Sequence, residues 1–421
     1  MQIVMGLVGV FALLGIAFLL SENRRAISLR TVLGAFAIQA MLGIFVLYVP
    51  AGKSMLLGLS EGVQAVMSSA NVGMDFLFGG LVSDKMFEVF GGGGFVFALR
   101  VLPIIVFFSS LIAVLYHLRV MNVVISVLGG GLSKILGTSR PESLSAAANI
   151  FVGQTEAPLV VRPFIAGMTR SELFAVMTGG LASVAGSVLV GYASLGIDLK
   201  YLLAASFMAA PGGLLMAKML IPETESKTQS VEEALGKDID RPTNVIDAAA
   251  SGAASGVQLA INVGGMLLAF IALIALGNII IGWVSGLFGY QDITLQLLLG
   301  YAFAPVAWVI GVPWHEAIQA GSFIGQKLVL NEFVAFADLA SHQIKLSEHS
   351  EAIIIFALCG FANLSSVAIL MGGLGLMAPN RRSDIAQMGM KLLRAIETFK
   401  HPMGVNHDIG PSRHYFAIHL F

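Results

Sequence analysis

Long apolar runs, separated by shorter polar segments, dominate the pattern along the chain. A helix needs about 20 mostly apolar residues to cross a bilayer. Runs that approach or exceed this length are Ile3–Leu20, Val32–Val49, Phe95–Leu118, Leu173–Leu195, Tyr201–Ile221, Val257–Phe288 and Ala352–Leu376. The pattern predicts an all-α polytopic membrane protein. The run at 257–288 is longer than a straight crossing requires, so we expect that helix to be tilted.

A charged segment at 223–250 divides this pattern into two halves. We interpret it as a cytoplasmic linker. Residues 1–222 then form an N-terminal half that contains the first five spans. Residues 251–421 form a C-terminal half with the sixth and seventh spans, followed by an atypical tail from about residue 391.

Basic residues assign the two sides of the membrane, because short cytoplasmic loops are rich in lysine and arginine. Arginine-containing clusters follow the first, third and seventh spans: Arg24, Arg25, Arg30; Arg119, Lys134, Arg140; Arg381, Arg382. The opposite loops carry only lysines among their basic residues: Lys53, Lys85, Lys200 and Lys345. The distribution predicts an N-terminus outside the cell.

Two further segments, 136–171 and 313–345, are apolar but carry too many polar residues for simple spans. We interpret each as a re-entrant helix–turn–helix hairpin. The stretches before them, 121–135 and 294–312, are expected to lie along the membrane surface as amphipathic helices.

The two halves also resemble one another in sequence. Gly180–Ser187 aligns without gaps to Gly360–Val367, and both stretches place small and polar residues where a helix can break. The charge distribution puts the first hairpin on the inner side and the second on the outer side. This predicts an inverted repeat with two re-entrant hairpins and two discontinuous helices, a plan that holds a solute at the membrane midplane.

Polar groups cluster at Asn149–Pro158 within the first hairpin, where Gln154, Thr155 and Glu156 follow Gly153. A carboxylate at membrane depth is costly and normally faces a cavity. Irregular backbone at that depth is tolerated only where it lines a cavity or is buried in protein. We therefore expect this stretch to offer polar groups to a solute.

Composition narrows the classes of function. Of the 421 residues, 57% are hydrophobic and 12% are charged, whereas soluble domains carry roughly 25% charged residues. A net charge of -1 gives no basic footprint for nucleic acid. The single cysteine, Cys359, excludes an internal disulfide and a cysteine-rich metal site.

Three stretches resemble the concentrative nucleoside transporter family in its bacterial, eight-span form. They are Gly153-Gln154-Thr155-Glu156-Ala157-Pro158; Gly325-Gln326-Lys327 with Asn331-Glu332-Phe333-Val334-Ala335; and Cys359-Gly360-Phe361-Ala362-Asn363 with Ser365-Ser366. The resemblance implies a homotrimer in the bacterial inner membrane. It also implies a scaffold made of spans three and six, a moving transport domain made of the rest, and nucleoside uptake coupled to sodium or protons without a further cofactor.

The resemblance also implies the substrate contacts. Glu332, Asn363 and Ser366 would bind ribose, because a carboxylate accepts hydrogen bonds from a pair of hydroxyls. The base would meet Gln154, Thr155, Glu156, Val188 and Phe361. Purely structural alternatives stay open: a salt bridge with Lys327 for Glu332, helix–helix contacts for Asn363 and Ser366, and plain packing for Phe361.

For the coupling ion, the resemblance implies oxygen ligands from the side chains of Asn149 and Ser183 and the carbonyls of Val152 and Val184. Ser183 could instead be a packing residue. Sodium is the expected ion, because a proton site calls for a titratable group, and Glu156 and Glu332 keep proton coupling open.

Two points stand apart from the resemblance. The eighth span should begin near Asp384, but the sequence from about 391 loses its apolar character. A different class, an intramembrane hydrolase with Glu156 and Glu332 as an acid–base pair, is also open. Against it, His315-Glu316 lacks the second histidine of a zinc-protease helix.

Overall fold

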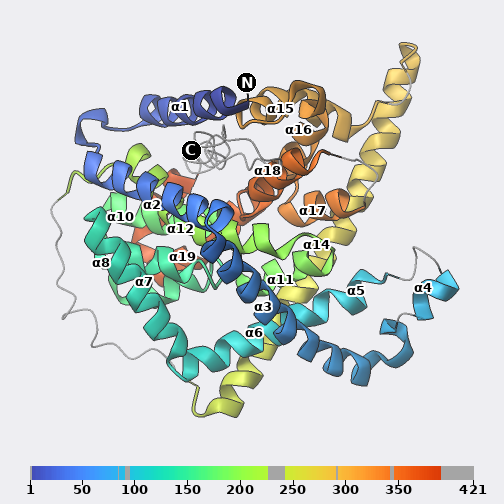
Figure 1. Cartoon of the computed structure of the whole chain (residues 1–421), viewed down its shortest axis with the longest axis horizontal. Coiled ribbons are helices and arrows are strands. Elements are labelled where there is room, and N and C mark those ends of the chain that lie inside the picture. The colour runs from blue at the N-terminus through green and yellow to red at the C-terminus, as the bar shows by residue number, and fades with distance from the viewer. Residues whose placement is uncertain are drawn as a thin grey trace.

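The computed structural model describes residues 2–83, 85–90, 95–225, 242–290, 293–341 and 346–389, and the regular elements in these ranges are helices (Figure 1). Six of the described helices are long and apolar enough to cross a membrane, or seven if one bent pair counts as a span. The predicted all-α, polytopic architecture is confirmed. The predicted tail from 391 lies outside the described residues.

The N-terminal half contains the first five predicted spans, the first hairpin and several short helices. Its α-helices are α1 (Gln2–Leu20), α2 (Leu29–Tyr48), α3 (Pro50–Phe78), α4 (Lys85–Phe90), α5 (Phe97–Arg100), α6 (Leu102–His117), α7 (Val120–Leu136), α8 (Arg140–Ala148), α9 (Arg162–Ile165), α10 (Arg170–Ala182), α11 (Gly186–Ser194) and α12 (Leu199–Leu220). Short 3-10 helices occupy Arg24–Ala26, Gly79–Val82 and Ala157–Val161.

The C-terminal half begins with the longest helix. Its elements are α14 (Val245–Leu287), α15 (Leu295–Val309), α16 (Trp314–Val329), α17 (Glu332–Ala340), α18 (Glu348–Leu358), α19 (Leu364–Met377) and a 3-10 helix at Pro379–Arg381. Residues 382–389 are helical as well, where the eighth span was expected to begin.

Helix α3 is the largest difference from the sequence prediction, which placed only a loop between the second and third spans. This 29-residue helix carries polar residues such as Lys53, Glu61 and Asp75 at intervals, and they broke the apolar run into pieces. Its composition still permits a membrane crossing. Lys53 then lies in the first turn of α3 and Lys85 lies beyond its other end, so they do not belong to a single loop.

Helix α14 starts earlier than predicted and absorbs the end of the expected linker. Asn244 caps the helix by accepting a hydrogen bond from the backbone nitrogen of Asp247, and alanines, which favour helices, follow. The helix is 43 residues long, well beyond the roughly 20 needed to cross a bilayer. It runs from the bottom of the view to the top right (Figure 1).

Helices α6 and α14, the predicted third and sixth spans, pack tightly against each other. A Cβ atom on Gly252 would lie 2.6 Å from the Ala113 side chain, and one on Gly256 would lie 2.7 Å from the Val106 backbone. The Ser110 hydroxyl donates to the carbonyl of Ala249 over 2.8 Å. Small residues thus let the two backbones approach closely, as at other membrane helix contacts.

The two predicted discontinuous helices are interrupted at the predicted places. The first breaks at residues 183–185, between α10 and α11. The second breaks at residues 359–363, between α18 and α19. The small and polar residues that the repeat aligned therefore lie at the breaks.

The two hairpin segments are also helix–break–helix units. In the first, α8 ends before an irregular stretch at 149–156, which leads into the short helices up to Ile165. In the second, α16 and α17 are separated only by residues 330–331. The expected surface helices correspond to α7 and α15, and α15 meets α16 at a bend of 115°.

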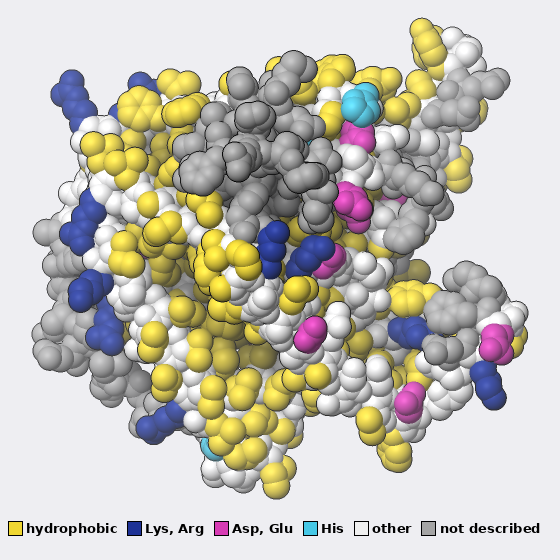
Figure 2. Space-filling view, in the orientation of Figure 1, with side chains coloured by type: hydrophobic (Ala, Val, Ile, Leu, Met, Phe, Trp, Pro, Cys, Tyr) yellow, Lys and Arg dark blue, Asp and Glu magenta, His cyan; other side chains and the backbone are white. Residues whose placement is uncertain are grey.

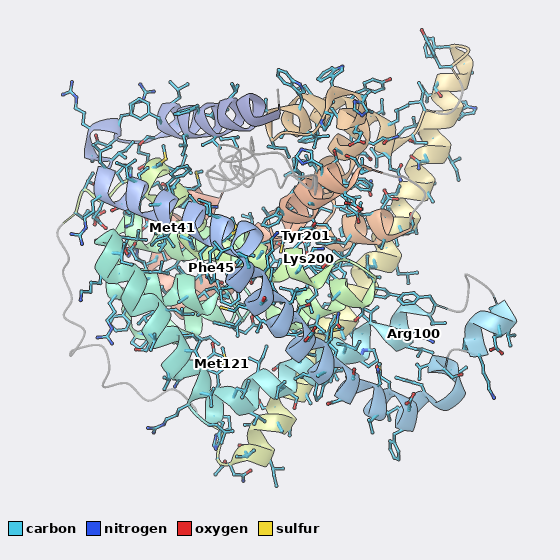
Figure 3. All side chains as sticks on the ribbon, viewed as in Figure 1. Met41, Phe45, Arg100, Met121, Lys200 and Tyr201 are labelled. Atoms are coloured by element: carbon cyan, nitrogen blue, oxygen red, sulfur yellow. The ribbon has the colours of Figure 1, made fainter. Side chains whose placement is uncertain are left out.

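The outer surface carries many large apolar side chains, with charged side chains scattered between them (Figure 2). Phe76, Ile246 and Phe288 are among the most exposed, at 89%, 81% and 75%. An apolar exterior of this extent suits contact with lipid rather than water. Arg100, labelled in Figure 3, donates to the backbone carbonyl of Ser83 over 3.0 Å.

Candidate functional site

Glu332 lies at the start of α17 and is buried, with 4% of its surface exposed. The preceding residue, Asn331, caps the helix by accepting a hydrogen bond from the backbone nitrogen of Val334 over 2.9 Å. The positive end of the helix dipole therefore lies next to the carboxylate and favours its charge.

The Glu332 carboxylate accepts hydrogen bonds from both broken helices. The hydroxyl of Tyr192, on α11, donates to Oε1 over 3.2 Å. The amide nitrogen of Asn363, at the second break, donates to Oε2 over 2.8 Å. One carboxylate thus joins the two halves of the chain.

The orientation of Asn363 follows from its position as the cap of α19. Its amide oxygen accepts from the backbone nitrogen of Ser366 over 2.8 Å and from the hydroxyl of Ser365 over 2.7 Å. That leaves the amide nitrogen to face Glu332. Three predicted ribose-binding residues, Glu332, Asn363 and Ser366, therefore lie together and are all buried.

The two breaks contact each other directly. The backbone nitrogen of Phe361 donates to the carbonyl of Ser183 over 3.2 Å. Phe361 is partly exposed, whereas Val188, in the first turn of α11, is 1% exposed. Val188 precedes Tyr192 by four residues and shares its helix face, so this predicted base contact lies on the side of α11 that faces Glu332.

The first hairpin approaches both broken helices. The Gln154 side chain packs against Gly180, where an added Cβ would lie 3.1 Å from that of Gln154. The methyl group of Thr155 lies beside Gly373 of α19. Gln154 is buried, Thr155 is partly exposed and Glu156 is exposed. Exposure of the three predicted base contacts therefore increases along the chain, from the buried Gln154 to Glu156 at the surface.

Asn149 ends α8 and lies against Gly179 of α10. Its amide nitrogen donates to the carbonyl of Ser145 over 2.9 Å. Among the residues that the structure describes, its buried amide oxygen has no hydrogen-bond partner, and neither has that of Gln154. A buried acceptor without a donor is costly, so these oxygens are candidates for a ligand.

The remaining predicted ion ligands lie around the first break. The backbone nitrogen of Gly186 donates to the carbonyl of Phe151 over 2.9 Å and holds residues 149–152 against the break. The Ser183 hydroxyl donates to the carbonyl of Gly179 over 2.9 Å, and its oxygen retains acceptor capacity. Val152 and Val184 are buried. Within the described ranges, no group of three or more His, Cys, Asp or Glu residues suits a metal.

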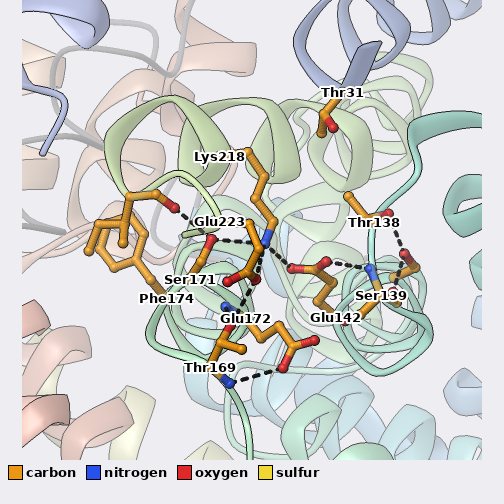
Figure 4. Close-up of polar contacts among 12 residues, drawn as sticks. Thr31, Thr138, Ser139, Glu142, Thr169, Ser171, Glu172, Phe174, Lys218 and Glu223 are labelled. Atoms are coloured by element: carbon orange, nitrogen blue, oxygen red, sulfur yellow. Dashed lines mark hydrogen bonds and ion pairs between the residues drawn. The ribbon is translucent and has the colours of Figure 1, made fainter. Parts of the chain in front are cut away.

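A second buried polar cluster was not predicted as a unit (Figure 4). The Lys218 ammonium lies 2.6 Å from Oε2 of Glu142 and 3.6 Å from Glu223, and it donates to the Ser171 hydroxyl over 2.9 Å. Glu142 also completes a capping box with Ser139 at the start of α8. The cluster fastens α8, α10 and α12 together, and it includes a residue of the expected linker.

Tyr192 was also missed, because a tyrosine in an apolar helix gives no sequence signal beyond packing. Lys218 gave the signal of a charge inside an apolar span, which calls for a buried partner. Its pairing with Glu142 is long-range, so the sequence did not identify the partner.

Models of three protein families match this chain. Residues 8–81 match "Na+ dependent nucleoside transporter N-terminus", residues 98–198 match "Nucleoside recognition", and residues 201–396 match "Na+ dependent nucleoside transporter C-terminus". Together these matches span both halves of the chain and include all the predicted site residues.

Relatives and solved structures agree with these matches. The chain is 56% identical to the uncharacterized transporter YutK of Bacillus subtilis, over 94% of this chain and 96% of that one. It is 50% identical to the nucleoside permease NupC of Helicobacter pylori, over 91% and 92%. A structure of a CNTnw variant in an outward-facing state superposes with a TM-score of 0.93 at 61% identity, covering 95% and 96%. The chain belongs to the concentrative, Na+-dependent nucleoside transporter family, and it is a transporter rather than an enzyme.

Proposed function

We propose that this protein imports nucleosides across the bacterial inner membrane by symport with sodium. The observation that carries the proposal is the Glu332 carboxylate, buried where the two broken helices meet and hydrogen-bonded to Tyr192 and Asn363. A buried carboxylate in a membrane protein is expensive and favours a functional role.

Glu332, Asn363 and Ser366 bind ribose in this proposal. A carboxylate accepts hydrogen bonds from adjacent hydroxyls, and hydrogen bonds to a charged group are stronger than neutral ones. The contact between Glu332 and Asn363 supports a shared role, since both side chains face the same point.

Gln154, Thr155, Glu156, Val188 and Phe361 form the base subsite. The buried amide oxygen of Gln154 has no donor among the described residues, so an imide or amino group on a base would satisfy it. Val188 supplies an apolar wall, and Phe361 supplies a partly exposed ring.

Sodium is held by the side chains of Asn149 and Ser183 and the carbonyls of Val152 and Val184. The donor set fits, because sodium takes oxygen ligands and Asn149 offers a buried oxygen that no described group satisfies. Carbonyls at the break between α10 and α11 supply the type of ligand that interrupted helices provide.

The proposed working unit is a homotrimer with an inverted repeat in each protomer. Helices α6 and α14 form the scaffold, and the hairpins, with the remaining spans, form the transport domain. The close glycine-lined contact of α6 with α14 supports this division, as does the backbone bond between the two breaks, which keeps the site within one body.

Uptake of labelled nucleosides into proteoliposomes tests the proposal. Each nucleoside is offered alone, with an inward sodium gradient or with choline at the same pH. We expect uptake of unaltered nucleoside only with sodium. Uptake that ignores sodium but follows an imposed pH gradient would favour proton coupling, with the titratable role falling to Glu156 and Glu332.

A further inference from the structure

Tyr192 is held rigidly beside the proposed ribose site. Its side chain is fully buried, at 0% exposure. Its ring centroid lies 4.6 Å from that of Phe333 and 4.3 Å from that of Phe336, with interplanar angles of 65° and 31°. Both partners lie on α17, the helix that begins with Glu332. Aromatic contacts on two rings thus fix where the Tyr192 hydroxyl points.

The hydroxyl points at one oxygen of the Glu332 carboxylate. Tyr192 donates to Oε1 over 3.2 Å, while Asn363 donates to Oε2 over 2.8 Å. Asn363 is held in turn, because its amide oxygen caps α19. Two fixed donors, one on each oxygen, define the plane of the carboxylate.

That plane determines how a ligand is recognised. A carboxylate accepts hydrogen bonds near the plane of its oxygens, in directions set by their lone pairs. Rotation of the carboxylate would move these directions away from a pair of adjacent hydroxyls. A group that prevents the rotation therefore favours a diol over a substrate that lacks one.

We propose that Tyr192 is a positioning residue of the nucleoside site, which acts by holding the Glu332 carboxylate in the orientation that receives the ribose hydroxyls. The inference rests on the proposed ribose role of Glu332. Because Tyr192 belongs to the first half of the chain and Glu332 to the second, the oriented carboxylate exists only when α11 and α17 are packed together.

Tyr192→Phe tests the inference, because it removes one oxygen atom and keeps the ring. We expect the KM for a ribonucleoside to rise about tenfold, the loss expected for one hydrogen bond to a charged group, with little change in Vmax. The preference for that ribonucleoside over its 2′,3′-dideoxy analogue should shrink as well. If Tyr192 had a purely structural role, the substitution would lower the affinity for both compounds equally, and that result would overturn the inference.

Tyr201→Phe is the matched control. Tyr201, on α12, is also buried, and its ring lies 6.3 Å from that of Phe356 on α18. We expect its KM and its preference for ribose to match those of the unaltered protein. An equal effect of both substitutions would overturn the inference, since it would reflect the loss of any buried phenol.

Glu332→Gln separates the inference from the proposed function. If this variant keeps full affinity for ribonucleosides, the ribose role itself fails. If it loses affinity while Tyr192→Phe keeps both KM and preference, only the positioning role fails. Should Tyr192→Phe aggregate, 3-fluorotyrosine at position 192 keeps ring and hydroxyl but makes the hydroxyl a stronger donor. Affinity should then change at position 192 and not at position 201, and unchanged affinity at both would overturn the inference.

Discussion

Glu142 and Glu332 are both buried carboxylates in the first turn of a helix, one in each half of the chain. Glu142 faces the start of its own helix and the ammonium of Lys218 at 2.6 Å. Glu332 accepts from the neutral side chains of Tyr192 and Asn363, which come from the two broken helices.

The difference teaches that burial alone does not identify a functional acid. The Glu142 carboxylate already has its partners within the protein, a fixed cation and the start of its own helix. Its role is therefore to hold helices together. A carboxylate that accepts hydrogen bonds only from neutral donors, where two broken helices meet, keeps a charge that a ligand can use. The two acids should therefore respond to substitution in opposite ways.

Lys218→Met should produce the largest effect, and on stability rather than on recognition. Removal of the cation leaves Glu142 as a buried, uncompensated charge, at a cost of about 3–5 kcal/mol. We expect a clear fall in the thermal unfolding midpoint of the purified protein. The double variant Lys218→Met with Glu142→Gln removes both charges and should recover much of the loss. A double variant no more stable than the single one would contradict this account.

Glu332→Gln should instead abolish most transport and leave the fold intact. The amide keeps the shape but loses the charge that strengthens two hydroxyl contacts, a loss of about 3 kcal/mol or roughly 100-fold in affinity. Uptake in proteoliposomes and the unfolding midpoint are measured on the same sample. Near-normal uptake would mean that Glu332, like Glu142, has a structural role only.

Asn149→Ala should affect the ion more than the solute. Loss of the amide oxygen should raise the sodium concentration for half-maximal uptake by about tenfold, and nucleoside affinity should fall with it, because coupling between two ligands is reciprocal. Ser143→Ala is the control on the same helix, since its hydroxyl donates to the Ser139 carbonyl. The same sodium dependence in both variants would contradict the proposed role of Asn149 as an ion ligand.

Gln154→Ala should give the smallest effect and the most selective one. A buried polar group left unpaired on a base costs about 1–3 kcal/mol. The affinity for nucleosides whose bases use this contact should therefore fall by about tenfold or more. Competition among nucleosides with different bases measures the change. Uniform weakening across all bases would mean that Gln154 supports the hairpin and does not read the base.

The helix breaks were predictable because small and polar residues recur at matching positions in both halves, as around Ser183 and Asn363. Helix α3 was not, because Lys53, Glu61 and Asp75 interrupt its apolar residues while its helical backbone continues. Pattern reasoning detects uniform apolar runs and misses helices in which polar residues recur along their length.

The site shows the same limit. Glu332 and Asn363 stood out as polar groups in apolar surroundings. Tyr192 did not, since its role depends on a contact with a residue in the other half of the chain. Lys218 and Glu142 likewise find each other only once α8 and α12 are packed. Local sequence identifies costly groups, and tertiary packing decides which of them satisfy one another.

The bond from the Phe361 nitrogen to the Ser183 carbonyl gives the two interruptions a shared mechanical character. An interrupted helix exposes backbone groups and would bend easily there if nothing else received them. Here the hydrogen bond links the two breaks, so a bend at one break would strain this bond unless the other break moved with it. The two breaks therefore resist bending together, and a ligand bound beside both of them would contact one connected unit of backbone.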